Sequence, residues 1–127
     1  MHQFENPPGM PKPAGHFHHV ITVTNETQRV VVSGQLGVRP DGTIAPDIEG
    51  QTEQTYANIL TALKSKGMGW GDVVRFAIYL TDKSYIEPFF KVRARILGDH
   101  KPASTLLIVA GLMKSEWLIE IDCEAAR

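Results

Sequence analysis

The sequence predicts an α+β fold in which two helices cover one face of a mixed sheet of about six strands. Short apolar segments with β-strand alternation stand at both ends of the chain and once in the middle, and two segments have helical spacing. The order is strands, helix, strand, helix, strands, and two helices of this length can cover only one sheet face. With 127 residues, the chain fits a single domain spanning residues 1–127.

The N-terminal part begins with an arm and continues with two strands. Residues 1–15 are rich in proline, which excludes helix and central strand, so we expect an extended arm over the surface. Residues 17–23 alternate imperfectly and predict a strand. A turn at 25–27 leads into a second predicted strand at 29–33.

The middle of the chain predicts a helix followed by a buried strand. Apolar residues recur at helical spacing from a cap near Asp47 to a stop at Gly67. Residues 73–80 are too apolar for a strand with one face in water, which indicates a central strand.

The C-terminal part predicts a helix and two strands. The second helix runs from Tyr85 to about Leu97, opened by a capping box of Ser84 and Glu87. Short apolar strands at 104–110 and 117–122 complete the set.

The strands at 73–80 and 104–110 are apolar on both alternating sets of positions, which suggests that both sheet faces are covered. Since the helices suffice for one face, a monomer would expose a large apolar patch. A closed homo-oligomer that packs sheet against sheet is the economical arrangement.

Composition excludes several classes of function. The net charge of −1 gives no electrostatic footprint for nucleic acid or for an anionic membrane. No apolar run approaches the ~20 residues of a membrane span, and the N-terminus lacks a secretory pattern. The single cysteine, Cys123, allows no internal disulfide. It alternates with Trp117, Ile119 and Ile121, which puts it on the strand face opposite Glu120 and indicates a small core residue. We therefore expect a soluble, cytoplasmic protein without nucleic-acid or membrane partners.

Four motifs in order resemble the Rid family, the reactive-intermediate deaminases, which are also called endoribonuclease L-PSP or translation-inhibitor proteins. They are Ser33-Gly34-Gln35, the helix phrase 51–60, Asp72-Val73-Val74 and Pro102-Ala103-Ser104-Thr105. The resemblance covers residues 15–125, nearly the whole chain. It implies a chorismate-mutase-like fold and a homotrimer that binds small molecules between its subunits.

The family's founding activity hydrolyses 2-imino or enamine acids to keto acids and ammonia. That chemistry needs a cation for the substrate carboxylate, a positioned water and a proton donor. At the matching positions the family's arginine is replaced by Ser104, its tyrosine by Phe17 and its asparagine by Phe89. Glu120 alone matches directly, as the candidate acid or base. The resemblance implies a cleft lined by Phe17, Ser33, Gly34, Phe89, Ser104, Thr105 and Leu106.

These replacements indicate a small-molecule cleft of altered specificity. Ser104 cannot neutralise a carboxylate, so we expect a neutral or less acidic ligand and no 2-imino acid deamination of the founding type. Three arginines, Arg75, Arg93 and Arg95, are candidates to replace the lost cation, although ordinary salt bridging is the simpler interpretation of each.

The histidines near the arm offer a second possibility. His16 or His18 is a candidate proton shuttle in place of the missing tyrosine. A metal site needs a third ligand that the sequence does not place beside them, and we expect neither metal nor cofactor.

Two classes of function fit these residues. The first is a hydrolase or deaminase acting on a C–N bond of a small molecule with Glu120. The second is a ligand-binding, regulatory or chaperone-like protein without turnover. A third, ribonuclease activity, follows the family label, but the near-neutral charge argues against it.

Overall fold

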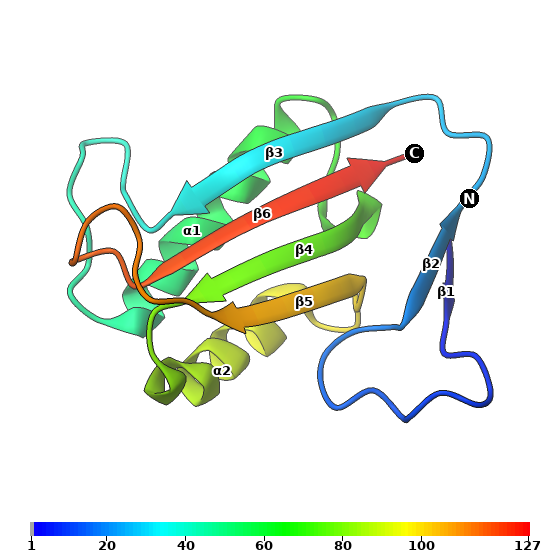
Figure 1. Cartoon of the computed structure of the whole chain (residues 1–127). Helices are drawn as coiled ribbons and strands as arrows, with labels where there is room; N and C mark the ends of the chain where they lie inside the picture. The colour runs from blue at the N-terminus through cyan, green and yellow to red at the C-terminus, as the bar shows by residue number, and fades with distance from the viewer. Residues whose placement is uncertain (1) are drawn as a thin grey trace.

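The computed structural model describes residues 2–127, and its elements follow the predicted order. The strands are β1 (His2–Glu5), β2 (Val20–Val23), β3 (Arg29–Leu36), β4 (Val73–Leu80), β5 (Ala103–Ile108) and β6 (Ile119–Ala126). The helices are α1 (Ile48–Lys64) and α2 (Ile86–Leu97), with short 3₁₀ turns at Trp70–Asp72 and Lys83–Tyr85. Both helices lie on the same side of the main sheet, and the other side is open (Figure 1).

The six strands divide between two sheets. The main sheet has the order β3-β6-β4-β5, in which β4 and β5 are parallel and the other pairs are antiparallel. The α+β class and the central position of 73–80 are confirmed, because β4 lies between β6 and β5. The remaining strands, β1 and β2, form a separate antiparallel pair beside the start of β5 (Figure 1).

Part of the predicted N-terminal arm therefore has regular structure. His2–Glu5 pairs with Val20–Val23, starting from His2 opposite Val23. The proline-rich stretch that follows joins these two strands without regular structure, since proline removes ladder donors. Because β1 pairs only with β2 and lies outside the main sheet, the described part of the arm supplies no central strand.

The core lies between the helices and the main sheet. Alternate residues of β6 face it, so that Ile119, Ile121 and Cys123 are fully buried. Burial raises the pKa of the Cys123 thiol to about 12, which makes it an unreactive core residue, as its strand position predicted. The intervening positions of β6, including Glu120, face the open side of the sheet.

Helix α1 begins where the sequence predicted and fixes the loop before β6. Asp47 caps it by accepting a hydrogen bond from Gly50 N at 3.0 Å. Inside the helix, the buried Gln51 donates to the carbonyls of Ala45 and Glu116 and accepts from Leu118 N, each at 2.9 Å. A polar side chain at this position satisfies three backbone groups, and it fixes the chain just before Glu120.

The predicted capping box of α2 is wrong. Asp82 accepts a hydrogen bond from Ser84 N at 2.8 Å and caps the 3₁₀ turn, while Tyr85, the N-cap of α2, makes no side-chain cap. Asp82 follows the end of β4 more closely than Ser84 does, and its carboxylate caps the 3₁₀ turn. Ser84 therefore lies inside that turn and not at the start of α2. Within residues 2–127, no helix is long and apolar enough to cross a membrane.

Candidate functional site

The first group of candidate residues lines an apolar cavity of about 190 Å³ beside the edge strand β5. The N-terminal arm contributes Gly15 and Phe17, α2 contributes Phe90 and Arg93, and β5 contributes Ser104 and Leu106. Ser104 lies beside Phe76 and Leu106 beside Ile78 in the parallel pairing, and both β4 partners face the helices. The cavity therefore lies on the helix side of the sheet.

Among the residues predicted to line the cleft, Thr105 and Phe89 do not line this cavity. Thr105 pairs with Ala77 and belongs to the opposite face of β5, where it is exposed. Phe89 is fully buried in the core with its ring stacked near Tyr56, at a centroid distance of 6.3 Å. Its neighbour Phe90 lines the cavity instead. The two phenylalanines are adjacent in α2 and point to different sides of the helix, so only the second of them reaches this cavity.

The second group surrounds Glu120 on the open face of the sheet. Glu120 lines a cavity of about 250 Å³ together with Tyr79, Val109, Gly111, Leu112 and Asp122. Gly34 lies directly against it, since a Cβ at position 34 would come within 2.8 Å of the Glu120 Cδ atom. Gly34 thus stands beside Glu120, in the irregular part of the β3–β6 pairing between Val32 and Gln35.

Tyr79 is a residue of this second group that the sequence analysis did not single out. Its hydroxyl donates to Asp122 Oδ2 at 3.4 Å, and both residues line the Glu120 cavity. The signal was present in the strand alternation, because Ile78 and Leu80 are core residues and Tyr79 must face the other way. It supplies a phenol hydroxyl on the face that carries Glu120, whereas Phe17 has none.

The two groups lie on opposite faces of one sheet. Ser104 and its neighbours face α2, while Glu120 and Tyr79 face the open side. A single chain therefore does not bring Glu120 together with Phe17 and Ser104.

The candidate histidines tie the arm to the segment before β5. His16 Nε2 bonds to the carbonyl of His100 at 2.9 Å, and His18 Nδ1 bonds to the carbonyl of Lys101 at 2.6 Å. Burial lowers the pKa of His16, and the nearby Arg93 acts in the same direction. Across residues 2–127, no three His, Cys, Asp or Glu side chains gather in a way that suits a metal ion.

The three candidate arginines differ in their partners. Arg75 bonds to Glu124 at 3.0 Å, and Arg95 bonds to Glu53 at 2.7 Å. Arg93 is 5% exposed, lines the β5 cavity, and takes no part in the ion pairs found among residues 2–127. Salt bridging thus accounts for Arg75 and Arg95 but not for Arg93.

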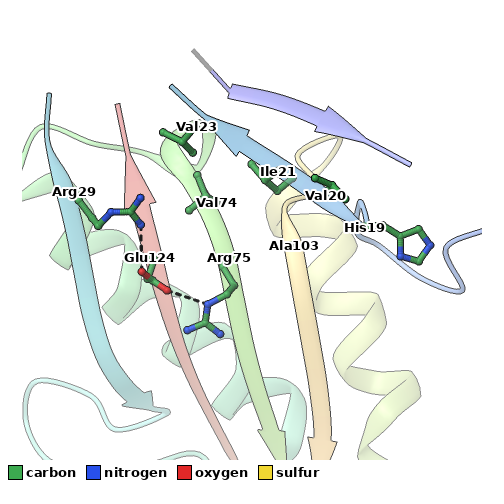
Figure 2. Close-up of a pocket in the computed structure, with 9 residues that line it drawn as sticks. All are labelled: His19, Val20, Ile21, Val23, Arg29, Val74, Arg75, Ala103 and Glu124. Atoms are coloured by element: carbon green, nitrogen blue, oxygen red, sulfur yellow. Dashed lines mark hydrogen bonds and ion pairs between the residues drawn. The ribbon is translucent and has the colours of Figure 1, made fainter. Parts of the chain in front are cut away.

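A third hollow, of about 500 Å³, lies between β2 and the end of the main sheet at which β3, β4 and β5 begin. Figure 2 shows Glu124 between Arg29 and Arg75, with Ile21 and Val23 of β2 nearby. The two arginines share Glu124, and Arg29 also pairs with Glu26 and Arg75 with Asp122. The hollow therefore presents little free charge for a ligand.

Comparison with known proteins gives consistent matches over most of the chain. The family model described as Endoribonuclease L-PSP matches residues 8–127. Protein HMF1 of Saccharomyces cerevisiae is 31% identical over 80% of this chain and 78% of its own length. The 2-iminobutanoate/2-iminopropanoate deaminase of Salmonella typhimurium is 28% identical over 77% of this chain and 79% of its own length. The crystal structure of YyfB from Yersinia pestis, of the Rid protein family, has a TM-score of 0.88 at 25% identity, covering 99% of this chain and 98% of its own.

Proposed function

Because this chain belongs to the Rid family, the family of the L-PSP model, we propose that it is a homotrimer that binds a small molecule in clefts between its subunits. We propose further that the cleft hydrolyses a reactive imine or enamine, or a related small metabolite, with Glu120 positioning the attacking water. The S. typhimurium relative named as a 2-iminobutanoate/2-iminopropanoate deaminase supports this class of reaction.

The observation that carries the proposal is the separation of the two candidate groups. The Glu120 group is on the open face, and the Ser104 group is beside the edge strand β5. A neighbouring subunit whose open face lies against this edge would bring one subunit's Glu120 to the other's Ser104. An oligomeric cleft joins two half-sites that the single chain keeps apart.

The open face itself supports an assembly. Leu107 is 50% exposed and Val31 is 70% exposed, and both belong to strands of the main sheet. Apolar side chains on an uncovered sheet face favour packing against another copy.

Imine hydrolysis requires one group that accepts a proton from water and donates a proton to the imine nitrogen. In imine hydrolysis, water adds to the C=N carbon, a proton passes to nitrogen, and ammonia leaves as the carbonyl forms. A carboxylate within reach of both atoms acts first as base and then as acid. Glu120 fits this role because Gly34 leaves its carboxylate room and because no ion pair of residues 2–127 engages it.

The first experiment measures imine hydrolysis in a coupled assay, with imines generated in situ by an amino-acid oxidase or an amine oxidase. Wild type is compared with Glu120→Gln and with the matched control Glu116→Gln, whose side chain is exposed in the loop before β6. We expect wild type and the control to accelerate hydrolysis and Glu120→Gln to lose the acceleration. Light scattering on the same samples should give the mass of three chains.

Binding without turnover is the competing function. The serine at 104 and the phenylalanine at 17, where the founding chemistry uses an arginine and a tyrosine, favour it. Absence of acceleration with every imine, in a correctly folded trimer, would select this alternative. Acceleration that survives in Glu120→Gln would remove Glu120 from the mechanism.

A further inference from the structure

Arg93 is a buried cation that takes part in no ion pair among residues 2–127. The side chain leaves the middle of α2 and is 5% exposed. Its guanidinium carbon lies 4.8 Å from the centroid of the Phe90 ring and 5.1 Å from that of Phe89. Its Nε atom is buried and has no hydrogen-bond partner.

Phenylalanine rings flank Arg93, and the nearby Tyr56 hydroxyl is buried without a hydrogen bond to it, which makes the lack of an acceptor costly. A guanidinium carries five N–H donors and keeps its charge, so a buried one requires anionic or carbonyl acceptors. The two phenylalanine rings stabilise the cation through their faces, but they accept none of its in-plane hydrogen bonds. The cavity that Arg93 lines is also lined by Phe17, Leu106 and the small Ser104.

We propose that Arg93 is the anion-binding residue of the β5 cavity and that the ligand is a small carboxylate with a short apolar chain. The planar guanidinium suits a bidentate carboxylate, and the Ser104 hydroxyl is a further donor in the same cavity. The apolar part of the ligand packs against Phe17, Phe90 and Leu106. This half of the cleft has a volume of about 190 Å³, enough for a ligand of this kind.

This inference rests on the proposed function only in identifying the cavity as half of the inter-subunit cleft. It replaces the expectation of a neutral ligand, which followed from Ser104 alone. The cation lost from β5 is supplied by α2, eleven positions earlier in the chain, and the small side chain of Ser104 leaves the space that the ligand occupies.

Binding is tested by calorimetry with 2-oxobutanoate, which is the stable product of 2-iminobutanoate hydrolysis, and with its neutral amide. We expect wild type to bind the acid at least about tenfold more tightly than the amide, a difference of about 1.4 kcal/mol. Arg93→Met should lose that preference, and Arg93→Lys should keep part of it. Arg95→Met removes an exposed arginine from the same helix and should behave as wild type.

Equal binding of acid and amide by wild type would overturn the inference, and that comparison needs no variant. So would an Arg93→Met protein that retains the preference. If Arg93→Met does not fold, Ser104→Asp provides a second test, since its carboxylate should pair with Arg93, raise the melting temperature and abolish binding of the acid. Failure of the acid to bind, in wild type, would assign Arg93 to a carboxylate of a neighbouring subunit.

The outcomes separate this inference from the proposed function. Binding of the acid that depends on Arg93, without any turnover, would support the anion site and reject the hydrolysis. Turnover of neutral imines that depends on Glu120, with no preference for the acid, would support the hydrolysis and reject the anion site.

Discussion

The Glu120 carboxylate occupies the space that a side chain at position 34 would take. A Cβ built on Gly34 would lie 2.8 Å from the Glu120 Cδ atom and closer still to Oε2. Glycine is required here for the close approach of a neighbouring side chain, since a real Cβ atom does not come that close to another heavy atom. The absence of a side chain at Gly34 of β3 therefore determines where the acid group of β6 can lie.

Replacing Gly34 with alanine should therefore disable the site without removing any of its functional groups. The added methyl group forces the Glu120 carboxylate to move, and a displacement of about 1 Å costs on the order of 100-fold in rate. The imine assay measures this loss. Gly69→Ala is the control, because nothing lies within 4 Å of its added Cβ and its φ of −140° suits any residue.

The adjacent phenylalanines of α2 should have different roles. Phe89→Ala removes a fully buried ring and should lower the free energy of unfolding by about 3–5 kcal/mol. Phe90→Ala removes a partly buried ring that lines the β5 cavity, so its stability cost should be smaller and its effect on ligand binding larger. Urea denaturation and calorimetry on both variants check this. A larger binding defect in Phe89→Ala at equal stability would reverse the assignment.

The proposed trimer should depend on the open face of the main sheet. Leu107→Glu puts a charge on this face, and burying it between subunits costs several kcal/mol. We expect the protein to dissociate, with a mass by light scattering below that of three chains. Met10→Glu, at an arm position of similar exposure (46% against 50%), should leave the mass unchanged. A trimer that tolerates Leu107→Glu would place the interface elsewhere.

Stability should fall in mildly acidic solution. Burial lowers the pKa of His16 and His100 below the ordinary histidine value of 6.5, so the unfolded chain binds more protons around and below that pH. The free energy of unfolding should therefore be greatest above pH 6.5 and decrease as the pH drops through the range between the unfolded and folded pKa values. Denaturant titrations from pH 8 to 5.5 measure it.

His100→Gln provides the comparison for this titration. Its amide can still donate to the carbonyl of Val73, the acceptor of the His100 ring at 2.9 Å, but it does not titrate. The variant should show a weaker dependence of stability on pH than wild type. An unchanged dependence would show that His100 does not contribute to the acid sensitivity.

Much of the fold could be predicted from the sequence because it depends on local patterns. The spacing of apolar residues identified α1 and its Asp47 cap, and the continuous apolar run 73–80 identified the central strand. Alternation along residues 117–123 placed Glu120 and Cys123 on opposite faces. The start of α2 was predicted less well, since Asp82 and Ser84 compete for the same turn.

The chemical groups of the candidate site are visible in the sequence, but their arrangement is not. A carboxylate stands at 120, a glycine at 34, and a serine where the family has an arginine. The folded chain shows that Phe90 rather than Phe89 meets the cavity, and that Glu120 and Ser104 lie on opposite sheet faces. It also buries Arg93 in the cavity that Ser104 lines, with no ion pair among residues 2–127, because side chains on a helix and on the strand beneath it meet through packing that no local pattern specifies.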